Sequence, residues 1–201
     1  MINISNYFSK TLYAITPDKP FNEYSLESAL ELYDISIVQY RRKNTDMKTL
    51  LNEAEQIKRI CQKYSTLFIV NDHIELADLC ESDGVHLGGN DHNIFEARDK
   101  LGQEAIIGKS CYNSIENALT AQKEGANYVA FGAIFPSETK PNAPTCSLET
   151  IREASSKISI PIVGIGGIDS SKLNEVFEAG CNSIAMSMLY FNQVADVRRK
   201  D

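Results

Sequence analysis

The residues with the clearest chemical potential are polar side chains that directly follow short apolar runs. The stretch "LFIVNDH" (67–73) passes from four apolar residues straight into Asn71 and Asp72. A carboxylate at the end of an apolar run is costly unless it is paired, solvated or bound to a metal. Asp91 follows the next apolar run, "GVHL" (84–87), in a similar way. Two carboxylates on adjacent loops are typical of a Mg²⁺ site beside bound phosphates, and the alternative is that each one caps the following helix.

A second group consists of cations and an amide in "VQYRRK" (38–43). Gln39, Arg41 and Lys43 are spaced by two residues, so in an extended segment they point to one side and Arg42 points to the other. Two cations and an amide on one face suit a phosphate or pyrophosphate. A solvated loop between a strand and a helix is the alternative interpretation.

Two further stretches have the composition of anion-binding loops. "PSETKP" (136–141) holds two hydroxyls, a carboxylate and a lysine between prolines. "GIGGID" (164–169) opens a helix with glycines, which let backbone N–H groups approach an anion. His86, inside "GVHL", is predicted to be a hydrogen-bonded side chain rather than a metal ligand. Cys111 is expected only to line the site, since the cysteines show no pattern typical of a nucleophile.

These polar segments need a scaffold that brings the ends of many strands together. Short β-rich runs occur at 12–16, 35–40, 67–70, 84–87, 105–110, 128–135, 160–165 and 183–188. Helical periodicity lies between them, most clearly at 46–63. Alternating strands and helices indicate a parallel sheet with crossovers. Eight units favour a single-domain (β/α)8 TIM barrel over residues 1–201, near the minimal length of that fold, rather than an open doubly wound sheet.

Composition limits the classes of partner. The net charge of -7 and the pI of about 5.1 argue against nucleic acid, which needs a basic surface. No apolar run approaches the ~20 residues that cross a bilayer, so no membrane partner is expected. The N-terminus lacks the features of a signal peptide, and the five cysteines are widely spaced. We therefore expect a cytoplasmic protein with reduced thiols, and a homo-oligomer is left open.

Six motifs in chain order together resemble the thiamine-phosphate synthase family. They are "VQYRRK", "FIVNDHIELA", "DGVHLGGND", "IGKSCYN", "YVAFGAIFPSETKPNAP" and "PIVGIGGI", and the resemblance covers residues 12 to 190. The family couples a hydroxymethylpyrimidine pyrophosphate to a thiazole phosphate and releases pyrophosphate. The resemblance therefore implies a Mg²⁺-dependent transferase whose partners are phosphorylated small molecules. Ser137 departs from the usual threonine, and "AMSML" leaves the register after the last strand uncertain by one residue.

The resemblance also implies a role for each matching residue. The pyrimidine pyrophosphate would be bound by Gln39, Arg41, Lys43, Asn71, Ser110 and Lys140. Among these, the residues expected to act in catalysis are Lys140, Arg41 and Ser110. Asp72 and Asp91 would hold Mg²⁺ on the pyrophosphate. The thiazole phosphate would be bound by Ser137, Thr139, Gly167, Met186 and Ser187.

Three alternatives share the barrel. A thiazole tautomerase-like relative keeps the thiazole phosphate site but tends to lose the pyrophosphate and metal residues, and carries a catalytic histidine after the sixth strand, near Ala133 here. A non-catalytic barrel that binds a thiamine-related phosphate would not need both Asp72 and Asp91. A phosphate-sugar isomerase would need an acid/base pair, and no convincing pair is found.

Overall fold

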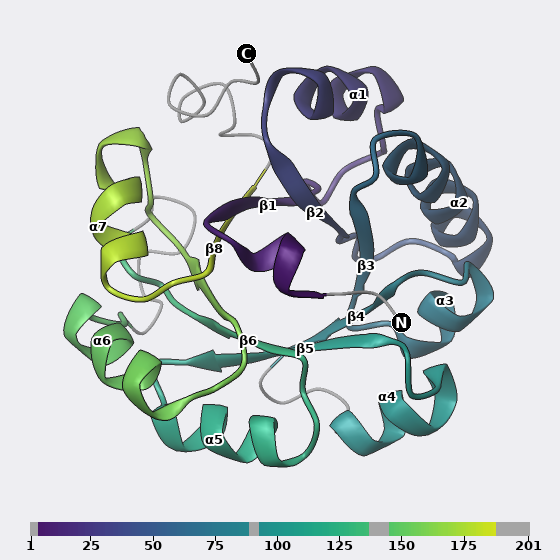
Figure 1. Cartoon of the computed structure of the whole chain (residues 1–201). Coiled ribbons are helices and arrows are strands. Elements are labelled where there is room, and N and C mark those ends of the chain that lie inside the picture. Colours follow the sequence, from purple (N-terminus) through teal and green to yellow (C-terminus); the bar gives the residue numbers. More distant parts are fainter. Residues whose placement is uncertain (1–3, 89–92, 137–144, 188–201) are drawn as a thin grey trace.

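The chain forms a closed barrel of parallel strands surrounded by helices (Figure 1). The computed structural model describes residues 4–88, 93–136 and 145–187. Within this part the strands neighbour one another in chain order, and β1 closes the barrel against β8. The strands are β1 Thr11–Ile15, β2 Ile35–Tyr40, β3 Leu67–Asn71, β4 Gly84–Leu87, β5 Ile106–Tyr112, β6 Tyr128–Phe131, β7 Ile162–Ile165 and β8 Ser183–Ser187. The predicted (β/α)8 barrel is confirmed, and the open sheet is wrong.

The helices occupy the crossovers and cover the outside of the barrel (Figure 1). They are α1 Glu23–Leu32, α2 Met47–Lys63, α3 Ile74–Leu79, α4 Ile94–Leu101, α5 Ile115–Lys123, α6 Leu148–Lys157 and α7 Leu173–Glu178, with the short 3-10 helices η1 Ile4–Phe8 and η2 Ser170–Lys172. Several begin at a polar residue whose side chain accepts a hydrogen bond from a backbone N–H three residues on, as at Asp46 before α2 and Ser114 before α5. Such caps fix where each helix leaves the rim of the barrel.

Two hydrophobic layers follow from the alternation of side chains along each strand. The outer layer packs between strands and helices and includes Val38, Phe68 and Val70. The inner layer fills the barrel, and its buried members are Phe8, Tyr13, Ile37, Leu67, Ile69, Ile106, Tyr128, Ala130, Val163 and Ala185. Helix η1 lies in the middle of the ring of strands in Figure 1 and places Phe8 in this layer. It precedes β1 directly, so it closes the end of the barrel where the strands begin.

The sixth strand is shorter than the sequence predicted. The expected strand covers 128–135, whereas β6 ends at Phe131. Beyond it the chain bends across the rim, where the Gly132 N–H donates to the Tyr112 carbonyl and the Ile134 N–H to the Ile165 carbonyl, at 2.9 and 3.0 Å. These two hydrogen bonds are not part of the regular pairing between parallel strands, and they hold Gly132 and Ile134 over the carboxyl ends of β5 and β7.

Candidate functional site

Several predicted site residues share the inward-facing register at the carboxyl ends of the strands. Gln39 lies two residues after Ile37, and Asn71 two residues after Ile69, and both isoleucines belong to the inner layer. Ser187 follows Ala185 in the same way on β8. Because side chains alternate along a strand, these polar groups line the interior at the rim. The fold therefore gathers residues that lie far apart in the chain around one opening.

The turn after β2 separates its cations to opposite sides, as their spacing predicts. Arg41 lies 3.5 Å from Asp18, in the loop after β1. Arg42 lies 3.8 Å from Glu53, on the α2 side of the sheet, and both side chains are largely buried. The Lys43 backbone N–H donates to Asp18 Oδ1 at 2.8 Å. Asp18 thus fastens the turn that carries Arg41.

The loop after β1 also holds the end of β2 through Thr16. The Thr16 N–H donates to the Gln39 carbonyl at 2.9 Å, and the Thr16 hydroxyl accepts from the Arg41 N–H at 2.9 Å. On the other side of the sheet, Glu53 accepts from the Tyr40 hydroxyl at 2.6 Å and from the Phe21 N–H at 3.2 Å. Backbone and side-chain contacts on both faces therefore fix the segment that presents Arg41.

Asp72 does not cap the next helix. Its backbone is left-handed, with φ of 61°, and its N–H donates to the His86 carbonyl at 2.9 Å. Its carboxylate accepts from the Gly88 N–H at 2.9 Å and from the Asn71 amide at 2.6 Å. The N-cap position of α3 is His73, which makes no side-chain cap hydrogen bond. The capping alternative is therefore wrong for Asp72, whose carboxylate is directed to the loop after β4.

The surroundings of Asp72 fit a hard divalent cation, which prefers oxygen ligands. Two N–H donors orient the carboxylate, and within the described residues it forms no ion pair with lysine or arginine. Asp91, its predicted partner, lies outside the described residues, and the N-cap of α4 is Asn93. No cluster of three or more His, Cys, Asp or Glu side chains suited to a metal occurs in the described part. A metal here would need Asp91 and the oxygens of a bound phosphate beside Asp72.

The interior below the rim holds a chain of hydrogen-bonded side chains. The Gln39 amide donates to the Tyr13 hydroxyl at 2.7 Å, which lies 2.8 Å from the Tyr128 hydroxyl. His86 links Tyr128 to Ser110, with both contacts at 2.9 Å. His86 is hydrogen-bonded, as the sequence predicted. Burial, with the nearby positive charge of Lys109, lowers the pKa of His86 to about 4, so the imidazole is neutral near pH 7.

The carboxyl ends of β7 and β8 carry the remaining described site residues. Gly167 has a φ of 65°, and a Cβ there would lie 2.5 Å from the Phe135 carbonyl oxygen, so this position needs glycine. Met186 belongs to the outer hydrophobic layer, whereas Ser187 has the inward register. Of these two residues, Ser187 is therefore the one whose side chain faces the barrel interior. The predicted residues Ser137, Thr139 and Lys140 lie outside the described residues.

Sequence reasoning missed three residues that shape the site. Tyr13 and Tyr128 fall within the apolar runs "LYAIT" and "YVAF", where they read as core residues. Asp18 follows the first strand in "TPDKP", which repeats the pattern of a carboxylate after an apolar run. That pattern could have indicated Asp18 in the same way as it indicated Asp72.

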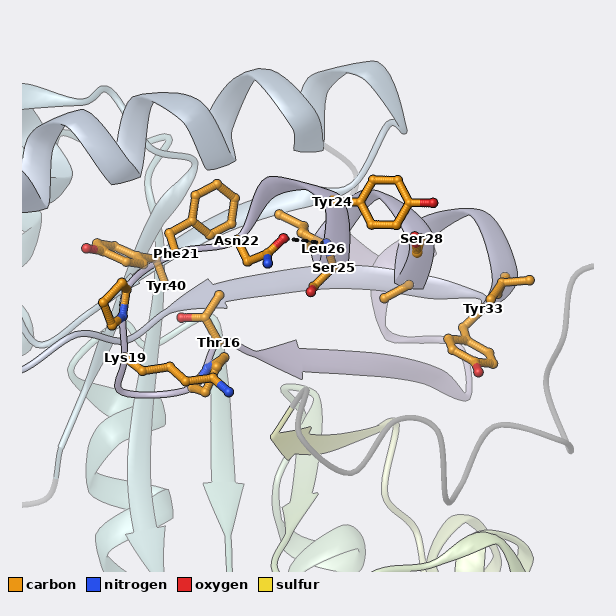
Figure 2. A pocket seen from close by; sticks show the side chains of 14 residues that line it. Thr16, Lys19, Phe21, Asn22, Tyr24, Ser25, Leu26, Ser28, Tyr33 and Tyr40 are labelled. Atoms are coloured by element: carbon orange, nitrogen blue, oxygen red, sulfur yellow. Dashed lines mark hydrogen bonds between the residues drawn. The ribbon is translucent and has the colours of Figure 1, made fainter.

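A cavity of about 520 Å³ lies along α1 (Figure 2). Thr16, Lys19 and Tyr40 line one end and Tyr33 the other, and side chains along α1, from Tyr24 to Leu32, line it between them. None of the predicted site residues lines this cavity. Because Thr16 follows β1 and Tyr40 ends β2, one end of the cavity adjoins the rim at these two strands.

The fold and the rim together define a class of protein. This is a (β/α)8 barrel whose carboxyl-end face carries a guanidinium, amides, hydroxyls and an oriented carboxylate, a set suited to phosphorylated small molecules. The family model described as thiamine monophosphate synthase matches residues 12–188. The chain belongs to this family.

Individual relatives agree with the family assignment. A thiamine-phosphate synthase of Methylococcus capsulatus is 46% identical over 194 residues, covering 95% of this chain and 86% of the relative. One of Nitrosospira multiformis is 40% identical over 189 residues, covering 93% and 80%. A solved thiamine phosphate pyrophosphorylase from Pyrococcus furiosus superposes with a TM-score of 0.85 at 32% identity, covering 98% of this chain and 93% of that one.

Proposed function

We propose that this protein is a thiamine-phosphate synthase that couples hydroxymethylpyrimidine pyrophosphate to thiazole phosphate and releases pyrophosphate. The observation that carries the proposal is the arrangement at the rim. Arg41 follows β2, Asn71 ends β3 and Asp72 follows it, and Ser110 lies near the carboxyl end of β5, so these side chains come from strand ends that share one opening. This is a set for a polyanion, and family membership supplies the reaction.

The proposed chemistry needs charge stabilisation rather than a protein nucleophile. The bond between the methylene carbon of the pyrimidine and the pyrophosphate oxygen breaks, so negative charge develops on the leaving group. Arg41, Lys43 and Lys140 would stabilise that charge, and Ser110 would donate a hydrogen bond to it. The electron-rich aminopyrimidine stabilises the cation left behind, and the thiazole nitrogen then forms the new bond to the methylene carbon.

We assign the magnesium to Asp72 and Asp91. When bound, it would neutralise charge on the pyrophosphate as the leaving group departs. Asp72 suits this role because its carboxylate is already oriented by the Gly88 and Asn71 donors. Gln39 and Asn71 would orient the pyrimidine pyrophosphate beside it.

The second substrate would lie against the loops after β6, β7 and β8. We assign its phosphate to Ser137, Thr139, the backbone at Gly167 and the end of β8 at Met186 and Ser187. The register of β8 supports Ser187 as the side-chain ligand, since Met186 is turned into the outer layer and could contribute only its backbone.

Two alternatives are less well supported. A thiazole tautomerase would be expected to have a histidine directly after the sixth strand, but the residues following β6 are Gly132, Ala133 and Ile134. A passive phosphate-binding barrel gives no reason for an oriented carboxylate beside the anion-binding set. The family assignment favours the synthase over both.

A cytoplasmic location accompanies the proposal. In the described part of the chain the five cysteines are all unpaired, which suits a reducing compartment. No described helix has the length and apolarity needed to span a bilayer. The acidic net charge of -7 gives no support for a nucleic-acid partner.

The test is the dependence of pyrophosphate release on both substrates. Purified protein is mixed with hydroxymethylpyrimidine pyrophosphate and Mg²⁺, and pyrophosphate is measured with and without thiazole phosphate. We expect sustained release only when both substrates are present. Thiazole isomerisation without pyrophosphate release would identify a tautomerase, and calorimetric binding without either reaction would identify a passive binder.

A further inference from the structure

A continuous path of hydrogen bonds crosses the interior of the barrel from β2 to β5. It runs from Gln39 through Tyr13, Tyr128 and His86 to Ser110, with contacts of 2.7, 2.8, 2.9 and 2.9 Å. The five residues come from five different strands. The exposed fractions are 4% for Gln39, 1% for Tyr13, 0% for Tyr128 and 8% for His86, so water does not compete for the three contacts among these residues, and only Ser110 is partly exposed.

The first donor sets the direction of every later bond. The Gln39 amide nitrogen can only donate, so the Tyr13 hydroxyl accepts from it. Either hydroxyl could donate in the contact between Tyr13 and Tyr128, but only donation by Tyr13 gives the hydrogen of its buried hydroxyl a partner among the described residues. Tyr128 then donates to His86 Nδ1. A neutral imidazole whose Nδ1 accepts carries its proton on Nε2.

The last hydrogen bond of this path sets the orientation of the Ser110 hydroxyl. His86 Nε2 donates to Ser110 Oγ, so the serine hydroxyl hydrogen has no partner among the described residues and is available to the rim. The opposite direction would use that hydrogen on His86 and leave only lone pairs toward the opening. A phosphate oxygen needs a donor, so only the direction set by Gln39 suits an anion.

We propose that Tyr13, Tyr128 and His86 are positioning residues that hold His86 as its Nε2–H tautomer and turn the Ser110 hydroxyl hydrogen toward the bound pyrophosphate. This rests on the proposed function, in which Ser110 contacts the leaving group. The three residues act through Ser110, and none of them needs to touch a substrate.

The packing around Tyr128 fixes the position of its ring. A Cβ at Gly108 would lie 2.0 Å from Tyr128 Cζ and 2.4 Å from its hydroxyl oxygen, so glycine makes the room for this ring. Phe8 packs on Tyr128 with ring centroids 5.1 Å apart, and His86 stacks on it at 5.5 Å. Burial raises the pKa of Tyr13 and of Tyr128, so both hydroxyls keep the hydrogens that the chain requires.

The first experiment measures the tautomer directly and needs no substrate. Nitrogen-15 NMR of histidine-labelled protein near pH 7.5, a condition chosen to be roughly one unit above the ordinary histidine pKa, distinguishes the two neutral tautomers. His86→Gln assigns the signal. We expect one Nε2–H tautomer in the wild type and a mixture in Tyr13→Phe, although Tyr13 contacts neither His86 nor Ser110. Tyr40→Phe is the matched control, because it removes a buried tyrosine contact on the other side of the sheet.

Two outcomes of this measurement would overturn the proposed relay, that is, the hydrogen-bonded path from Gln39 to Ser110 with its fixed direction. One is a wild-type His86 that carries its proton on Nδ1. The other is a Tyr13→Phe spectrum identical to that of the wild type, which would mean that the direction is not transmitted from Gln39.

The second experiment tests whether the hydrogen-bonded path acts through Ser110. Loss of a hydrogen bond to a charged group lowers a rate by roughly ten- to a hundred-fold. We expect Tyr128→Phe to lower kcat by about this factor with little change in KM for thiazole phosphate. In a Ser110→Ala background the same substitution should have no further effect.

The kinetic outcomes separate this proposal from the proposed function. Equal losses for Tyr128→Phe in both backgrounds would show a merely structural role and overturn the positioning role. A normal coupling rate in Ser110→Ala would contradict the assignment of Ser110 to the leaving group, and with it the functional half of the proposal. Absence of coupling in the wild type, with the Nε2–H tautomer present, would contradict the proposed function and leave the relay standing.

Discussion

Asp72→Asn separates the charge of this residue from its structural contacts. The backbone of Asp72 has a φ of 61°, a conformation that asparagine adopts more readily than most residues. An asparagine Oδ1 can still accept from the Gly88 N–H, which now bonds to Asp72 at 2.9 Å. Asp72→Ala would lose both advantages, since the left-handed conformation costs alanine about 1–2 kcal/mol.

The expected magnitudes differ for stability and for activity. Asp72→Asn weakens the contact with the Asn71 amide, a loss of about 1 kcal/mol. For a domain of this size that lowers Tm by about 2–4 °C. In the proposed metal-binding role of Asp72, removal of its charge should lower kcat by roughly 10²- to 10³-fold. The effect on rate is therefore much larger than the effect on folding.

The assay is steady-state coupling at saturating Mg²⁺, together with thermal unfolding of the same samples. Asp46→Asn is the matched control, because Asp46 caps α2 and asparagine is an equally good cap. It should keep coupling within about two-fold, since it removes no contact to an anion. Near-normal turnover by folded Asp72→Asn, or full activity in excess EDTA, would refute the metal-binding role of Asp72.

Three further predictions test the residues around the rim. Arg41→Ala should raise KM for the pyrimidine pyrophosphate. Arg42→Ala should leave KM unchanged and lower the free energy of unfolding in urea by about 1–2 kcal/mol, because its partner Glu53 lies on the α2 side of the sheet. A larger effect on KM from Arg42→Ala than from Arg41→Ala would contradict the opposite orientations of the two side chains. Gly108→Ala should lower Tm by about 5–15 °C, because overpacking and broken contacts at Tyr128 together cost about 2–5 kcal/mol. An unchanged Tm would show that the Tyr128 ring is not fixed against Gly108. Burial raises the pKa of the Cys111 thiol to about 12. At pH 8 the native protein should therefore react slowly with a disulfide reagent, whereas the unfolded protein should react rapidly at all five cysteines. Rapid labelling of the native protein would contradict this burial.

The architecture was predictable because its signal is local. Strands of a closed parallel barrel are buried on both faces, so they read as apolar runs, and the polar residues that follow mark their carboxyl ends. "LFIVND" shows both features in six residues. The opposite directions of Arg41 and Arg42 were equally readable, because alternation along an extended segment needs no tertiary information.

The relay was not predictable because it depends on registers between strands. Tyr13 and Tyr128 lie 115 residues apart and meet only once the barrel closes. In sequence each tyrosine is one aromatic residue in an apolar run, and nothing distinguishes a packed ring from a donor. The left-handed backbone of Asp72 was also hidden, since aspartate is common both there and at helix caps.

The central claim is that this rim couples two phosphorylated rings with the departure of pyrophosphate. The most direct measurement is mass-spectrometric detection of thiamine phosphate after purified protein is incubated with both substrates and Mg²⁺, with pyrophosphate quantified in the same samples. We predict equal amounts of the two products in the wild type, and strongly reduced amounts of both in Asp72→Asn and in Arg41→Ala. Folded wild-type protein that binds both substrates and forms no thiamine phosphate would contradict the claim.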